Sequence, residues 1–162
     1  SRDLKRSTAV ATKINEEFEG ERVRGVEAQT PEEIGKAIKN SEIVLAAGAA
    51  GTPLLPLNVL KEHGKNCKIV ADINAIPPLG VEGLKSKIDG EEILPNILGI
   101  GALAIGKLKI KVETELIKRA AEEPKGIFDY KIAYEIAKKP IIEKLSEKKA
   151  TVESQDQKHW LP

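Results

Sequence analysis

Apolar positions along the chain follow the spacing of helices in some segments and of buried strands in others. Residues 3–18 carry an apolar stripe at three- to seven-residue spacing, ended by Gly20, which predicts a helix. Residues 30–33 have the sequence Thr-Pro-Glu-Glu, which is typical of a helix start with Thr as N-cap and Glu in a capping box. A further helix is expected over residues 54–62.

Continuous apolar runs predict buried strands over residues 43–47 and 68–73, the first of them covered on both faces. Residues 23–28 are a short strand candidate. Because such strands alternate with helices, we predict an α/β fold with a mainly parallel sheet and flanking helices.

The C-terminal third has a different pattern. Residues 107–122 predict a helix, or a strand followed by a helix. We expect Asp129 to cap a further helix that Pro140 bends or restarts. Residues 146–162 are polar apart from a lone Trp160, which predicts a loosely ordered tail.

Composition excludes several classes of function. The 162 residues hold 26 Lys and Arg against 25 Asp and Glu, so the net charge of +1 favours neither nucleic acid nor an acidic membrane. The single Cys67 excludes an internal disulfide and suits a reducing, cytoplasmic setting. Two distant histidines predict no metal site, and the longest apolar stretch, residues 43–56, is too short to span a bilayer.

The first candidate site is Ser1-Arg2, directly before the first helix. In dinucleotide folds, a cation after the second strand holds the 2′-phosphate of NADP, and an Arg offers a planar fork to it. Lys5 and Arg6, one helical turn further on, would add charge. A solvated basic helix start explains the same residues and, from these residues alone, is the better interpretation.

Two further candidates follow the predicted strands. Residues 48–51, Gly-Ala-Ala-Gly, would let the backbone approach a ligand, although a tight turn also favours small residues. Asp72 and Asn74 end the second strand, and open α/β sheets bind ligands at the carboxyl ends of their strands. The alternative for Asp72 is that it caps the next turn.

Residues 99–104 match the pattern G-x-G-x-x-A, with Glu122 about twenty residues further on, as in a dinucleotide fingerprint. Pro95 and Asn96 argue against the strand that this fingerprint needs before it. We therefore interpret the glycines as a close-packed turn against the other end of the ligand.

Alternate lysines at 107, 109 and 111 would all point one way in an extended segment and meet an anionic or polar substrate there, while a solvated edge is the alternative. No Ser-His-Asp or Cys-His arrangement and no P-loop is visible in the sequence. Acyl transfer, phosphoryl transfer and metal hydrolysis are therefore not predicted.

Three segments together carry a family resemblance: residues 70–80 (Val-Ala-Asp-Ile-Asn-Ala-Ile-Pro-Pro-Leu-Gly), 101–109 (Gly-Ala-Leu-Ala-Ile-Gly-Lys-Leu-Lys) and 126–129 (Gly-Ile-Phe-Asp). With residues 47–51 upstream, the chain resembles the NADP-dependent methylene-tetrahydromethanopterin dehydrogenases, which are relatives of the bifunctional methylene-tetrahydrofolate dehydrogenases. The resemblance runs from Ser1 to about Lys138, and the stretch from Asp72 to Gly80 is its most specific part.

The resemblance implies a cytoplasmic, homo-oligomeric oxidoreductase with an N-terminal pterin domain and a Rossmann-type NADP domain. It implies that residues 1–112 form a Rossmann-like domain that is incomplete at its N-terminal side, without its first strand and Gly-rich phosphate turn. Residues 113–146 would be helices packing on that domain or on the missing one, and residues 147–162 a polar tail. A sheet without its central first strand is expected to expose an unpaired edge.

The resemblance also implies residue roles. It places NADP against Ser1, Arg2, Lys5, Ala47, Gly48, Asp72, Asn74, Ala75 and Gly101, with Ser1 and Arg2 at the 2′-phosphate and Asp72, Asn74 and Ala75 near the nicotinamide. It places Lys109 in the cleft between domains, as a catalytic contact or a contact to the tetrahydropterin one-carbon carrier. Two departures are Ala46 in place of Thr, which removes a hydrogen bond, and Asp3 in place of a second cation, which weakens selectivity for NADP.

In such an enzyme the hydride passes from the methylene carbon to the nicotinamide without a general base, because orientation of two rings supplies most of the help. Two alternatives stay open at this point. One is a non-catalytic nucleotide-binding fragment. The other is a different Rossmann dehydrogenase of the shikimate type, which shares the Arg signal but does not explain residues 72–80.

Overall fold

The computed structural model describes residues 1–123 and 125–142. The chain divides into two compact units, Ser1–Ile105 and Gly106–Pro162. The domain boundaries expected after residues 112 and 146 stay a prediction, and the expected polar tail lies outside the described residues.

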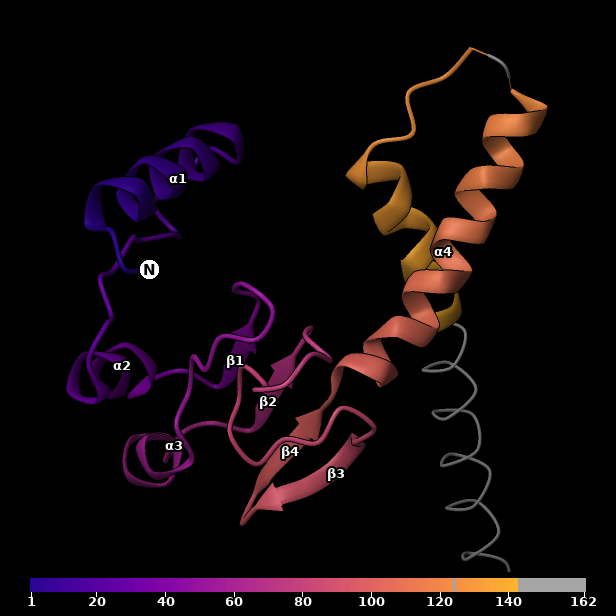
Figure 1. Cartoon of the computed structure of the whole chain (residues 1–162). Coiled ribbons are helices and arrows are strands. Elements are labelled where there is room, and N and C mark those ends of the chain that lie inside the picture. Colours follow the sequence, from indigo (N-terminus) through magenta and orange to yellow (C-terminus); the bar gives the residue numbers. More distant parts are fainter. Residues whose placement is uncertain (124, 143–162) are drawn as a thin grey trace, which may run out of the picture. The chain divides into compact units, whose positions relative to one another are not determined.

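The first unit is built on a four-stranded sheet with the strand order β1-β2-β4-β3 (Figure 1). Strands β1 (Ile43–Ala46), β2 (Ile69–Asp72) and β4 (Ile97–Ile100) run parallel, and β3 (Asp89–Leu94) is antiparallel to β4. The predicted α/β class with a mainly parallel, Rossmann-like sheet is therefore confirmed.

The hairpin of β3 and β4 was not predicted. Pro95 and Asn96 form its two-residue connection, and Asn96 adopts a positive φ of 65°. The inference that these residues exclude a strand before Gly99 is wrong, because they lie in the turn that precedes β4.

One face of the sheet packs against α2 (Pro31–Ile38) and α3 (Leu57–His63), which lie next to each other (Figure 1). The core there is aliphatic and centres on Val70 and Leu60, both with no exposed surface. The predicted capping box at Thr30 and Glu33 is confirmed. Helix α3 begins later than predicted because Leu55 pairs with Val81 in a β-bridge and Pro56 is the N-cap.

The opposite face of the sheet is bare in the described residues. Ile43 and Leu45 of β1 are 63% and 58% exposed, and Leu98 of β4 is 43% exposed. The pairing of Ile43 with Ile69, and of Ile69 with Leu98, places these side chains on one face. The prediction that the β1 segment is covered on both faces is therefore wrong, and β1 forms an edge of the sheet.

Helix α1 (Leu4–Glu17) is confirmed, with Asp3 as its N-cap. Residues 23–28, predicted as a strand, have no regular secondary structure. They run alongside α1, where the Asn15 side chain donates to the Val23 carbonyl (2.7 Å) and the Ala28 N–H donates to the Ser1 carbonyl (2.8 Å). A strand needs a neighbouring strand, and the part of the chain that the structure describes offers these residues none.

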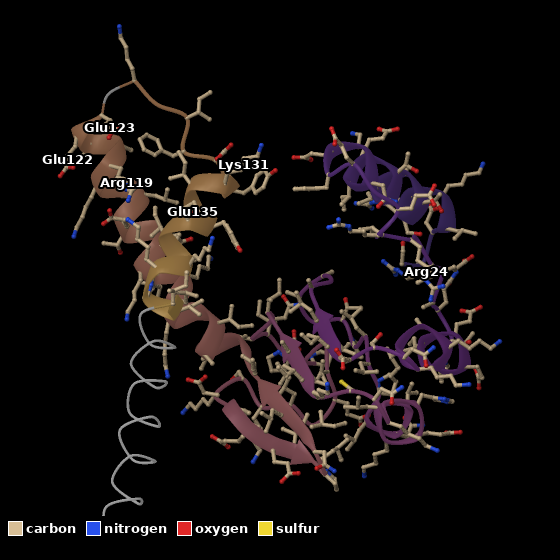
Figure 2. The ribbon with its side chains drawn as sticks, turned by 180° about the vertical axis from the view of Figure 1, so that it is seen from behind. Arg24, Arg119, Glu122, Glu123, Lys131 and Glu135 are labelled. Carbon is tan, nitrogen blue, oxygen red and sulfur yellow. The ribbon has the colours of Figure 1, made fainter. Side chains whose placement is uncertain are left out.

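Helix α4 (Ala102–Glu122) leaves the first unit and continues into the second. A further helical segment covers residues 130–142, and Asp129 caps it as predicted by accepting from the N–H groups of Lys131 (3.0 Å) and Ile132 (3.3 Å). Pro140 lies inside this segment and does not restart it. Figure 2 labels Arg119, Glu122 and Glu123 near the end of α4, and Lys131 and Glu135 on the segment that follows.

The lysines at 107, 109 and 111 lie on α4, not on an extended segment. Because successive helical residues rotate by about 100°, neighbours two positions apart point in nearly opposite directions, so the expected one-sided row of lysines is wrong. None of the helices among the described residues has the length and apolar character that crossing a membrane requires.

Candidate functional site

A cavity of about 490 Å³ in the first unit brings three distant segments together. The first is the chain start, with Ser1, Arg2 and Arg6. The second is Ala28 and Gln29, and the third is the turn after β1, which includes Gly48 and Ala49. The volume falls within the range of small-molecule sites, about 300–1,000 Å³.

The start of the chain is hydrogen-bonded to residues 28–29. The Gln29 side chain donates to the Arg2 carbonyl (3.1 Å) and the Ser1 hydroxyl accepts from the Asp3 N–H (3.1 Å). Asp3 in turn accepts from the Arg6 N–H (3.0 Å), which starts α1 at this place. These bonds fix the backbone from which both arginine side chains leave.

Arg2 and Arg6 make no ion pair within the described residues, so both guanidinium groups are available to an anion. Of the two cations that the sequence analysis offered as added charge, Arg6 lines the cavity and Lys5 does not.

Gly48, in the turn after β1, also lines the cavity. A Cβ atom there would lie 2.7 Å from Leu54 Cδ1, so a larger residue at this position would require the Leu54 side chain to shift. The predicted neighbour Ala47 is exposed and is not among the lining residues. The structure thus places Ser1, Arg2 and Gly48 at one cavity, as the sequence predicted, without Ala47.

Asn74 adjoins the same wall from the turn after β2. Its side-chain amide donates to the Gly48 carbonyl (3.0 Å). Asp72 is only 1% exposed, and its two carboxylate oxygens accept from the N–H groups of Asn74 (2.9 Å) and Val81 (3.0 Å). Asp72 therefore stabilises the turn that follows β2. Neither the buried Asp72 nor the exposed Ala75 lines the cavity.

Gly101 has a packing role in this structure. A Cβ there would lie 2.4 Å from the carbonyl oxygens of Lys85 and Ser86. At the start of α4, the N–H groups of Gly101 and Leu103 already donate to Ile88 and Ser86. The G-x-G-x-x-A segment begins inside β4 and opens α4, but these donors are engaged, which matches its interpretation as a close-packed turn.

Lys109, the predicted catalytic residue, lies on α4 in the second unit. It is exposed and pairs with Glu113 one helical turn further on, at 3.4 Å. Such an exposed pair contributes at most about 0.5 kcal/mol to stability, so it leaves the ammonium group free to exchange partners.

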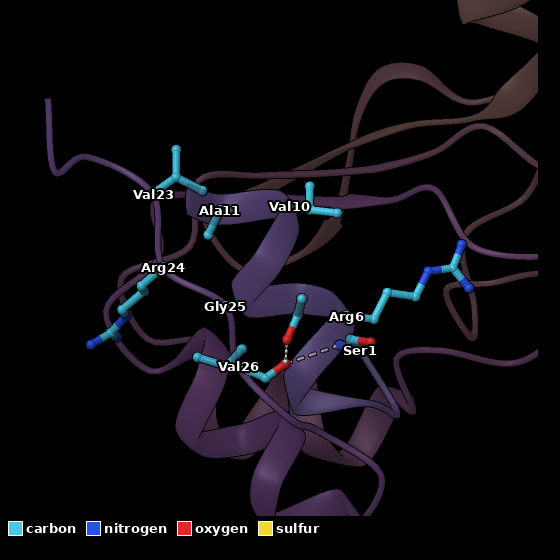
Figure 3. A pocket seen from close by; sticks show the side chains of 9 residues that line it. Ser1, Arg6, Val10, Ala11, Val23, Arg24, Gly25 and Val26 are labelled. Atoms are coloured by element: carbon cyan, nitrogen blue, oxygen red, sulfur yellow. Dashed lines mark hydrogen bonds between the residues drawn. The ribbon is translucent and has the colours of Figure 1, made fainter. Parts of the chain in front are cut away.

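A second cavity of about 350 Å³ lies between α1 and residues 23–26 (Figure 3). There the Ser7 hydroxyl and the Ser1 amino group both donate to the Val26 carbonyl (3.3 Å). Figure 3 shows Arg6 and Arg24 pointing to opposite sides, so the two cations do not converge on one anion. The cavity lined by Arg2, Arg6 and Gln29, called the Arg2 cavity below, is the better candidate site because it is larger and brings both arginines together with a turn at the end of a strand.

Metal and thiol chemistry find no support in the part of the chain that the structure describes. No group of three or more His, Cys, Asp or Glu residues there could hold a metal ion. Burial raises the pKa of the Cys67 thiol, which keeps it protonated and unreactive near neutral pH.

No family model matches the chain. It is 34% identical over 139 residues to the "Bifunctional protein MdtA" of Methylorubrum extorquens, covering 85% of this chain and 46% of that protein. It is 30% identical over 117 residues to the "NAD(P)-dependent methylenetetrahydromethanopterin dehydrogenase" of the same organism, covering 71% and 39%. The chain thus spans less than half the length of either relative, and the similarity supports a place in the dehydrogenase family.

Proposed function

We propose that this chain is the cofactor-binding part of an NADP-dependent methylene-tetrahydromethanopterin, or methylene-tetrahydrofolate, dehydrogenase. The observation that carries the proposal is a cavity lined by two arginines, neither of which is ion-paired among the described residues, and by a glycine-containing turn at the carboxyl end of a parallel strand. Doubly wound sheets bind dinucleotides in this position. The similarity to the protein of Methylorubrum extorquens whose name is NAD(P)-dependent methylenetetrahydromethanopterin dehydrogenase supports the same assignment.

Arg2 and Arg6 would hold the 2′-phosphate of NADP. Guanidinium groups form short, charge-assisted hydrogen bonds to phosphate oxygens, often in pairs. Asp3 lies between them in the sequence, and its carboxylate caps α1 by accepting from the Arg6 N–H. Its negative charge so close to the phosphate would lower the preference for NADP over NAD without removing it.

Gly48 and Ala49 would lie against the adenosine portion of the cofactor, since a turn without bulky side chains lets the backbone approach closely. The cavity fits this role by size and by its charge. When bound, NADP supplies the hydride acceptor, and the contribution of this chain is to bind and orient it.

Lys109 would contact the tetrahydropterin carrier, with the hydride leaving its methylene carbon. An exposed ammonium that pairs with a helical neighbour, as Lys109 does with Glu113, can turn toward an anionic or polar substrate. The cytoplasmic location and the homo-oligomeric state belong to the same proposal.

The test is isothermal titration calorimetry with NADP and NAD on Arg2→Ala and on Lys5→Ala. Each variant removes one cation, but only Arg2 lines the cavity. Because a hydrogen bond to a charged group contributes about 1.5–3 kcal/mol, Arg2→Ala should weaken NADP binding by roughly 10- to 100-fold and NAD binding far less. Equal losses for both cofactors, or an equal effect of Lys5→Ala, would refute the role of Arg2.

A further inference from the structure

Two turns meet at the carboxyl end of the sheet. The cavity turn, residues 47–53, follows β1 and lines the Arg2 cavity. The anchor turn, residues 73–80, follows β2 and, apart from its link to Gly48, lies outside the lining. The two strands are neighbours and their last residues, Ala46 and Asp72, are paired.

Asp72 fixes both ends of the anchor turn. One carboxylate oxygen accepts from the N–H of Asn74 at its start (2.9 Å), and the other accepts from the N–H of Val81 just after its end (3.0 Å). The carboxylate is 1% exposed, so solvent does not compete for these bonds. Gly80 packs closely here, because a Cβ would approach the Asp72 carboxylate to 3.1 Å.

The anchor turn is hydrogen-bonded to the cavity turn and to the residues directly after it. Within the cavity turn, the Gly48 carbonyl accepts from the Asn74 side-chain amide (3.0 Å). Directly after the cavity turn, the N–H groups of Leu54 and Leu55 donate to the Gly80 carbonyl (2.8 and 2.9 Å). The bonds to Gly80 involve backbone groups alone. Asn74 therefore supplies the side-chain hydrogen bond from the anchor turn to Gly48 in the cavity wall.

We propose that Asn74, held by Asp72, is a positioning residue that keeps the cavity turn preformed for the adenosine portion of a nucleotide, without touching the nucleotide itself. The inference rests on the proposed nucleotide-binding function. A preformed wall raises affinity because the ligand does not have to order it on binding. It assigns Asn74 a different role from a contact to the nicotinamide.

The test compares Asn74→Ala with Asn66→Ala in the full chain. Asn66 is a matched control, because its side-chain amide also donates to a backbone carbonyl, that of Lys39 (3.4 Å), and it does not line the cavity. Two probes are titrated by calorimetry, adenosine 2′,5′-bisphosphate and adenosine 5′-monophosphate. Amide hydrogen exchange of residues 48–50 is measured without ligand.

Loss of one hydrogen bond that orders the wall should weaken both probes by the same factor, about three- to tenfold, and speed amide exchange at residues 48–50. Asn66→Ala should leave the affinities and that exchange unchanged. Asn74→Ser, which keeps a short donor, should recover part of the affinity, and it carries the test if the Ala variant does not fold.

Different failures are distinguishable. If the unsubstituted chain binds neither probe, the proposed function falls, and this inference falls with it. If the unsubstituted chain binds and Asn74→Ala changes neither affinity nor exchange, only the positioning role falls. If Asn74→Ala weakens the bisphosphate alone, Asn74 contacts the ligand directly and the positioning role is again wrong.

Discussion

The two faces of the sheet differ in what covers them. The face toward α2 and α3 holds an aliphatic core in which Val70 and Leu60 have no exposed surface. On the other face, Ile43 and Leu45 remain more than half exposed. Mainly parallel sheets are normally covered on both faces, so the packed face supplies the stability of this unit and the bare face marks where further contacts would add to it.

The strongest test of the difference between the two faces replaces one leucine on each of them. Leu60→Ala should lower the free energy of unfolding by about 2–5 kcal/mol, because it opens a cavity in the packed core. Leu45→Ala should change it by no more than about 0.5 kcal/mol, since the side chain is largely exposed already. Denaturant titration of both variants measures the contrast. Comparable losses would mean that the bare face is covered in solution.

Replacing either of two glycines by alanine should change the stability by a smaller amount, with opposite signs at the two positions. Gly101→Ala should destabilise by about 1–3 kcal/mol, because its Cβ would meet backbone carbonyls. Gly106→Ala should stabilise by about 0.5–1 kcal/mol, since nothing lies within 4 Å and alanine favours the helix. Thermal melting of the two variants checks both signs, and a loss at Gly106 would show that α4 packs there.

The smallest expected effect is a pH dependence on the packed side. Hydrogen bonds from the N–H groups of Gln29 and Thr30 lower the pKa of Glu33 below its ordinary value of 4.5. A lowered folded-state pKa adds stability that is fully present above that ordinary value and is lost as the pH falls through the lowered one. Glu33→Gln should flatten this acid limb of the unfolding curve. An unchanged limb would remove Glu33 from the capping box.

The sequence predicted the packed side of the first unit better than the bare side. Helix periodicity and the capping residues at Thr30 located α1 and α2, and apolar runs located β1 and β2. The hairpin of β3 and β4 was missed because Pro95 was taken as a strand breaker when it lies in the turn. Residues 23–28 have a strand-like sequence, but strand formation depends on a partner that local sequence does not specify.

The candidate site was predicted in part for similar reasons. The sequence brought Ser1, Arg2 and Gly48 together, and the structure does the same. The side chains of Asp72 and Asn74 are engaged with backbone groups of two turns, and only long-range contacts show this. Arg6 was undervalued because only the folded structure shows that it lines the same cavity as Arg2.

The most direct test of the account is calorimetric titration of the unsubstituted chain with NADP and with NAD at one ionic strength. The account predicts measurable binding of both cofactors, with NADP bound more tightly through Arg2 and Arg6, and a preference that weakens as salt rises. Binding of NAD with equal or higher affinity than NADP would contradict it.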